Sequence, residues 1–324
     1  MTQLLAPELI AVPPPALLDG TTRATLEGIP HPARRLAGPV LVASTDPASI
    51  DGALRIAELL ARRDRVNAHI LGVVPPVATH FRFLARDHSA GMDEGRRQTH
   101  HAALRRQVHQ TVGRPVHFST GVEIGPTLDV IGSVAGARGS RLVLVGLEPK
   151  ETPQRGQGEQ LALRAAAAAG VPVLAVPVAA ALLPRRALVA IDLGDASIQA
   201  ARATLTTMAR GSAITLAFVA PSVEPNPAVD GGVSIPTAAV RDSLDRLVAE
   251  LGAPDDIRID TVILEGAPVS ALLRFASAGE YDLIAMGSRT TPRSRYRLAG
   301  SVCLGLLRSA MGAVLIATPP KGEQ

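Results

Sequence analysis

The chain has 324 residues, 47% of them hydrophobic but only 2% aromatic, and a formal net charge of +4. This length suits two domains of ordinary size, whose cores must be built from Ala, Val, Leu and Ile. The sequence has no basic run with interleaved aromatic residues, which argues against nucleic-acid binding, and no apolar run of about 18 residues, which argues against a transmembrane helix.

Cys303 is the single cysteine, so no intramolecular disulfide forms, and a reducing compartment is indicated. The N-terminus lacks the basic region and long apolar core of a signal peptide, and Pro13-Pro14-Pro15 interrupts it. We therefore expect a cytoplasmic protein.

Residues 1–37 are rich in Pro, Thr and Gly and predict a flexible N-terminal tail. A regular alternation of apolar strands and amphipathic helices follows, which predicts α/β architecture. The predicted strands of the first series are Val40–Ala43, Ala68–Val74, Val116–Glu123, Arg141–Gly146 and Val171–Val176. The predicted helices between them are Ser49–Arg63, Met92–Val112, Thr127–Ala137 and Gln157–Ala169.

The same order then repeats after a short connection at 178–186. The second series predicts strands at Ala187–Asp192, Ala213–Val219, Ile257–Leu264, Leu283–Met286 and Ala313–Ala317. Its predicted helices are Ser197–Ala209, Ala238–Leu251, Val269–Ala278 and Ser301–Ser309.

Glycine spacing supports two copies of one unit. Gly125 to Gly146 spans the same number of residues as Gly266 to Gly287. Strands that alternate with helices form parallel, doubly wound sheets with helices on both faces. We expect one domain over residues 38–178 and a second over residues 186–319.

The stretch Asp282–Val302 has the pattern of a phosphate-binding turn. An apolar strand stops at Gly287, a loop with four arginines follows, and Gly300-Ser301 opens the next helix. Backbone N–H groups at a helix N-terminus are unpaired and attract anions, and glycine lets a ligand approach the backbone. The arginines of the loop are candidates for contacts with phosphate, or they form an ordinary solvated loop.

These residues resemble a motif of the universal stress proteins. The motif has a glycine after strand four, a second glycine three residues on, and Gly-Ser or Gly-Thr after nine more residues. The second repeat has Gly287 and Gly300-Ser301 in register, but Thr290 stands in place of the second glycine. Asp192, at the end of strand one, and Val219, at the end of strand two, match further family positions.

The chain therefore resembles a tandem universal stress protein of the adenine-nucleotide α-hydrolase-like fold, with five-stranded sheets of order 3-2-1-4-5. The resemblance implies that the second domain binds ATP, together with Mg²⁺. It places Val219 at the adenine, Asp192 near the base and ribose, and the Gly-Ser-Val turn at the phosphates. The implied nucleotide-binding residues are Asp192, Val219, Met286, Gly287, Thr290, Gly300, Ser301 and Val302.

The first repeat departs from the motif. Thr45 stands where Asp192 stands, Pro149 replaces the second glycine, and Glu159 replaces Ser301. A carboxylate beside a phosphate is repulsive, by about 4 kcal/mol for charges ~4 Å apart at an effective dielectric of ~20. We therefore predict that the first repeat has a degenerate site and does not bind nucleotide.

Other candidate residues favour ordinary structural roles. His100, His101 and His109 share a predicted helix, but their spacing gives no pair on one face for a metal, so we interpret them as surface residues. Cys303 in the first turn of its helix is interpreted as a small packed side chain rather than a redox thiol.

No catalytic constellation is present, so the sequence indicates at most a slow ATPase. The main hypothesis is a stress-response protein that binds ATP and acts as a nucleotide-dependent regulator. The alternatives are an interaction module without nucleotide binding, or a weak ATPase or autophosphorylating enzyme. The resemblance also implies that Val171–Val176 and Ala313–Ala317 pair within the chain as fifth strands, and that whole chains form homodimers.

Overall fold

The computed structural model describes residues 38–76, 86–113, 115, 117–148, 156–220, 237–288 and 301–319, with only the backbone described at 86–91 and 301. All of them belong to one compact unit, Leu36–Gln324. The predicted tail at 1–37 lies outside the described residues.

The first half of the chain (residues 40–177) alternates strands and helices. Its strands are β1 (Val40–Ser44), β2 (Ala68–Val74), β3 (Phe118–Ile124), β4 (Leu142–Leu147) and β5 (Val173–Pro177). Its helices are η3 (Pro47–Ser49), α2 (Asp51–Asp64), α3 (Arg86–Val112), α4 (Thr127–Ala137) and α5 (Gln157–Ala169). Every residue of β1, β2 and β4 is buried, which is typical of parallel strands covered on both faces.

The second half (residues 186–317) has the same alternation. Its strands are β6 (Arg186–Ile191), β7 (Ala213–Ala220), β8 (Arg258–Glu265), β9 (Leu283–Gly287) and β10 (Ala313–Ala317). Its helices are α6 (Asp195–Thr207), α7 (Thr237–Leu251), α8 (Pro268–Ala278) and α9 (Ser301–Ser309). The predicted elements are present in both halves, most of them within two residues of the predicted bounds.

Two differences from the predicted elements stand out. The 3₁₀ turn η3 precedes α2, where Asp46 accepts a hydrogen bond from the Ala48 amide at 3.0 Å. Helix α3 begins at Arg86, six residues before the predicted start at Met92. The added turn at residues 86–91 is mostly polar, so no apolar periodicity marks it in the sequence.

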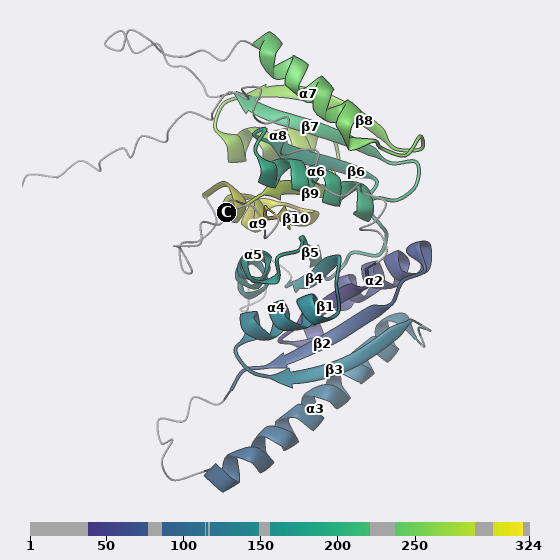
Figure 1. The fold of residues 1–324 in the computed structure, drawn as a ribbon, viewed down its shortest axis with the longest axis vertical. Helices are drawn as coiled ribbons and strands as arrows, with labels where there is room; N and C mark the ends of the chain where they lie inside the picture. Colours follow the sequence, from purple (N-terminus) through teal and green to yellow (C-terminus); the bar gives the residue numbers. More distant parts are fainter. Residues whose placement is uncertain are drawn as a thin grey trace, which may run out of the picture. The chain divides into compact units, whose positions relative to one another are not determined.

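All ten strands form one sheet of order β3-β2-β1-β4-β5-β10-β9-β6-β7-β8 (Figure 1). Within each half the strands are parallel and follow the order 3-2-1-4-5. The halves join where β5 pairs antiparallel with β10, with Leu174 opposite Leu315. The expected pairing of the fifth strands is thus present, and it merges the two expected sheets into one.

Each face of this sheet has its own apolar core, and both cores extend across the β5–β10 junction. Helices α2, α3, α6 and α7 cover one face, and their core includes Leu174 of β5 and Leu315 of β10. Helices α4, α5, α8 and α9 cover the other face, and their core includes Ala175 of β5 and Val314 of β10. Alternate residues of β5 and β10 point to opposite faces, so this one strand pair contributes to both cores.

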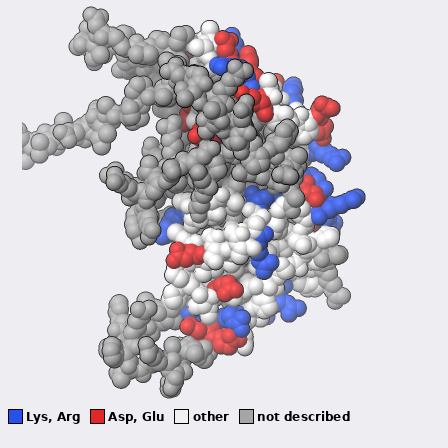
Figure 2. Space-filling model, in the orientation of Figure 1, with Lys and Arg blue, Asp and Glu red and all other residues white. Residues whose placement is uncertain are grey.

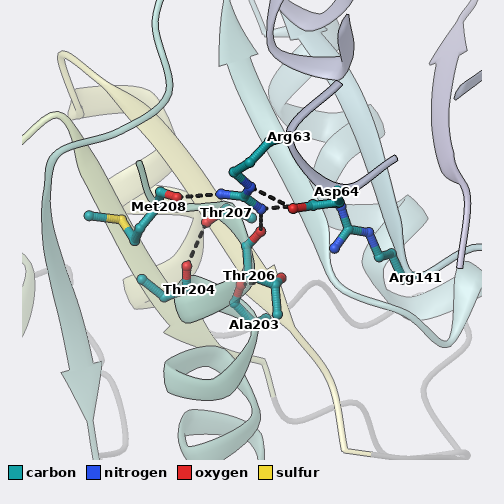
Figure 3. Close-up of polar contacts among 8 residues, drawn as sticks. All are labelled: Arg63, Asp64, Arg141, Ala203, Thr204, Thr206, Thr207 and Met208. Carbon is teal, nitrogen blue, oxygen red and sulfur yellow. Dashed lines mark hydrogen bonds and ion pairs between the residues drawn. The ribbon is translucent and has the colours of Figure 1, made fainter. Parts of the chain in front are cut away.

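Arg63, at the end of α2, connects the two halves on one face of the sheet (Figure 3). Its guanidinium donates hydrogen bonds to the carbonyl of Thr206, at 2.6 Å, and to the carbonyl of Met208. These carbonyls lie at the C-terminal end of α6, where carbonyl groups lack helical partners and attract cations. Arg63 of the first half therefore caps a helix of the second half.

Asp64 holds Arg63 in this position. Its carboxylate accepts hydrogen bonds from Arg63 Nε at 2.6 Å and from Arg141. Burial alone would raise the pKa of Asp64, but the hydrogen bonds and charges of Arg63 and Arg141 outweigh burial and lower this pKa. Asp64 therefore stays ionised and fixes both arginines.

On the described part of the face that Figure 2 shows, basic and acidic side chains are interspersed. A protein that binds nucleic acid presents a patch or stripe of one sign, and the described part of this face shows no such patch. None of the helices in the described ranges is long and apolar enough to cross a bilayer.

Replacing Arg63 with Met should lower the free energy of unfolding by about 2–3 kcal/mol, because the change breaks a partly buried ion pair and uncaps α6. The neighbouring Arg62→Met variant is the control, since the Arg62 side chain is 71% exposed and its pair with Glu58 should contribute less than about 1 kcal/mol. Urea unfolding of both variants measures the difference. Equal losses would contradict the role of Arg63.

Acid should destabilise the protein through His69. Burial, then the charge of Arg138, lowers the pKa of His69 from 6.5 to about 4. Between these values the unfolded chain binds a proton that the folded chain excludes, so stability falls as pH falls, by up to about 3 kcal/mol. Urea unfolding from pH 7 to pH 4 should show this slope reduced in His69→Asn and unchanged in the exposed-residue control His109→Asn.

Candidate functional site

Asp192 follows β6 and forms a tight turn at the start of α6. Its Oδ1 accepts a hydrogen bond from the Gly194 amide at 3.0 Å, and its own amide donates to Ser197 Oγ at 3.3 Å. Leu193 between them has a φ of 61°, which a branched residue adopts only under strain. The turn presents an exposed carboxylate at the C-terminal edge of the sheet.

Gly287, the last residue of β9, packs directly against the start of α6. A Cβ added there would lie 2.4 Å from the Ala196 carbonyl carbon and the Ser197 amide nitrogen. No side chain fits in this space, so the close approach of helix and strand requires glycine whether or not a ligand binds. The expected role of Gly287 in ligand approach is thus joined by a packing constraint that the sequence pattern does not reveal.

Helix α9 begins beside the end of the same strand. Cys303 in its first turn donates a hydrogen bond through Sγ to the Gly287 carbonyl at 3.7 Å. Burial first, and also the charge of Asp192, raise the pKa of Cys303 to about 11, while a hydrogen bond with Ser288 opposes this shift. The thiol is 5% exposed and protonated, in agreement with its interpretation as a packed side chain.

The remaining predicted residues divide into described and undescribed positions. Val219 is half-buried near the end of β7, Met286 is buried in β9, and Val302 is half-buried in α9. For Ser301 only the backbone is described, as the first residue of α9. Thr290, Gly300 and the arginines of the intervening loop lie outside the described residues.

The described candidates gather at one point of the sheet. β6 lies between β7 and β9, so the ends of these three strands carry Val219, Asp192 and Gly287 along one edge. The chain leaves β6 towards β7 and later returns to the other side at β9, which makes this edge a topological switch point. The N-terminal turns of α6 and α9 both open onto it.

The first half has the same junction with different side chains. A Cβ at Gly146 would lie 2.0 Å from the Ser49 carbonyl oxygen, as close an approach as at Gly287. The Gly158 amide, in the first turn of α5, donates a hydrogen bond to Glu148 Oε2 at 3.0 Å. Glu159 is 7% exposed. Glu159 was the residue expected to repel a phosphate here, but Glu148 is the residue that contacts the helix start, and no sequence pattern indicates this contact.

The histidines of α3 differ from their prediction as surface residues. His101 Nε2 lies 3.2 Å from Thr120 Oγ1, and the ring of His100 lies over Gly72 of β2. Of His100, His101 and His109, only His109 is exposed. The described residues contain no group of three or more His, Cys, Asp or Glu side chains that could hold a metal ion.

Comparison with known proteins identifies the second half. The family model of the Universal stress protein family matches residues 184–318. The second half of the chain is a universal stress protein domain. Its β6, β9 and α9, with the edge described above, all lie within the matched residues.

Solved structures extend the likeness of fold to both halves. A universal stress protein from Archaeoglobus fulgidus matches with a TM-score of 0.60 at 16% identity, over 89% of this chain and 99% of that chain. A functionally unknown protein from Pseudomonas aeruginosa matches with a TM-score of 0.52 at 18% identity, over 88% and 94%. A putative universal stress protein from the same species gives 0.51 at 18% identity, over 88% and 95%. No curated protein sequence matches the chain.

In this universal stress protein domain, Gly287→Ala should lower the free energy of unfolding by about 1–3 kcal/mol, because the added methyl group forces α6 away from β9. Gly95→Ala is the matched control, since Gly95 lies exposed within α3 with no other atom within 4 Å of an added Cβ. That change should stabilise the chain by up to about 1 kcal/mol. Thermal unfolding distinguishes the two, and an equally stable Gly287→Ala variant would contradict the packing constraint.

Proposed function

We propose that the second half binds ATP, together with Mg²⁺, and that the protein is a stress-response regulator whose partner contacts depend on the bound nucleotide. The observation that carries this proposal is the convergence of Asp192, Gly287 and the start of α9 at the switch point of the sheet. The Cys303–Gly287 hydrogen bond and the effect of Asp192 on the Cys303 thiol both support this proximity.

The chemistry of the edge suits an adenine nucleotide. The first turn of α9 offers unpaired amide groups to phosphate oxygens, and Ser301 begins that turn. Asp192 offers a carboxylate to ribose hydroxyls, and it is also the carboxylate of this edge that would hold Mg²⁺ alongside phosphate oxygens. Val219, in the adjacent strand, offers a half-buried apolar surface to the base.

The first half is a second copy of the same unit in this proposal, with a structural or regulatory role. Its junction retains the packing glycine Gly146 but has Glu148 at the start of α5. We propose domain limits of 38–178 and 186–319, with the paired β5 and β10 replacing the contact between separate subunits. Association of whole chains and a cytoplasmic location stay predictions.

An interaction module without nucleotide binding is the second candidate function. Gly287 is required by the packing of α6, so this glycine would be kept even in a domain that had lost its ligand. Thr290 in place of the second motif glycine points the same way. Nucleotide content separates the two functions.

Isothermal titration with Mg-ATP tests the proposal. The wild-type chain should bind one equivalent, and Gly300→Val should abolish binding by filling the phosphate turn. Asp192→Asn should weaken binding about tenfold or more, because it removes a charged hydrogen-bond acceptor while keeping the oxygen that the Gly194 amide contacts.

Asp245→Asn is the control, because Asp245 is exposed in the middle of α7 and is not among the residues proposed to bind the nucleotide. Its affinity should equal that of the wild type. Mass spectrometry of the denatured protein adds a second measurement, in which release of an adenine nucleotide is expected. A wild-type chain that neither releases nucleotide nor binds Mg-ATP would favour the interaction module.

A further inference from the structure

The helix start in the first half is contacted by a carboxylate of the chain itself. Glu148 immediately follows β4, and its Oε2 accepts a hydrogen bond from the Gly158 amide at 3.0 Å. A Cβ added to Gly158 would lie 2.5 Å from the Gly146 carbonyl oxygen and 2.8 Å from Glu148 Oε2. The carboxylate, the end of β4 and the first turn of α5 are therefore in direct contact.

The corresponding junction of the second half lies between β9 and α9. Gly146 and Gly287 have corresponding places in the two halves. Gly146 is the next-to-last residue of β4 and packs against Ser49 and Ile50, just before α2. Gly287 is the last residue of β9 and packs against the start of α6. Counted forward from these glycines, Glu148 corresponds to Arg289. The charge at this sequence position is therefore reversed between the halves.

A second carboxylate of the same helix turn is buried. Glu159 is 7% exposed, and its Oε2 is fully enclosed without a hydrogen-bond partner in the described part of the chain. Buried polar oxygens normally have a partner, so this oxygen stands out among the described residues of the first half.

We propose that the Glu148 carboxylate is a tethered ligand that fills the anion-binding position of the first half. A carboxylate oxygen accepts the helix-start amide as a phosphate oxygen would, and its charge is favoured by the positive end of the helix dipole. The first half then has an intact anion cradle that is occupied from within. An external phosphate is excluded by the bound carboxylate, and Glu159 adds a second repulsive charge.

This proposal assigns exclusion mainly to Glu148, and it concerns the first half alone. It holds or fails independently of nucleotide binding by the second half. Removing the tethered carboxylate should therefore create anion binding at α5, which a merely degenerate site would not show.

Titration with inorganic phosphate tests this prediction. All chains carry Ser301→Glu, which gives the second half the residue present at the matching position of the first half. In this background, Glu148→Ala with Glu159→Ser should bind phosphate at least about tenfold more tightly than Glu159→Ser alone. Phosphate that binds elsewhere on the chain contributes equally to both variants, so it does not affect the difference between their affinities. Equal affinities, or no binding by a folded double variant, would overturn the proposal.

Hydrogen exchange provides a measurement that does not depend on gained binding. In an otherwise wild-type chain, Glu148→Ala should speed exchange of the Gly158 amide about tenfold or more, because a charge-assisted hydrogen bond is lost. Glu250→Ala, on the exposed face of α7, is the control and should leave that amide unchanged. An unchanged Gly158 amide in Glu148→Ala would show that the carboxylate does not occupy the helix start.

Discussion

The antiparallel pairing of β5 with β10 is the contact on which the rest of the structure depends. Each half alone would end in an open strand edge of apolar residues, and such edges recruit other chains. Pairing the two edges within one chain buries both, and it lets each apolar core continue from one half to the other. Arg63 reinforces the same junction by capping α6 from the end of α2.

The candidate site depends on a second constraint, the close approach of two helix starts to the end of β9. Glycine at position 287 allows α6 to reach the strand, and Cys303 brings α9 to the same carbonyl group. The N-terminal turns of two helices then lie near one exposed carboxylate, Asp192. In the first half we propose that the same geometry excludes an external anion, because the Glu148 carboxylate accepts the hydrogen bond of the Gly158 amide at the start of α5.

Much of this fold could be predicted from the sequence, because buried parallel strands are continuous apolar runs and the helices between them are amphipathic. The strand order and the pairing of the fifth strands came from the resemblance to universal stress proteins. Local pattern could not reveal contacts between distant residues. Nothing in the sequence indicates that Glu148 reaches Gly158, that Arg63 reaches Thr206, or that His100 lies over Gly72. The polar first turn of α3 was missed because it lacks apolar periodicity.

Gly146 and Gly287 also show how a single motif position can be fixed by packing alone. Both residues are fixed by the space between a strand end and a helix backbone, so either would persist after all affinity for a ligand had vanished. This glycine therefore reflects the architecture of the unit, and it is present in both halves. Discrimination between a binding and a non-binding copy must come from positions such as 148, 159, 192 and 301, where the two halves carry different chemistry on the same scaffold.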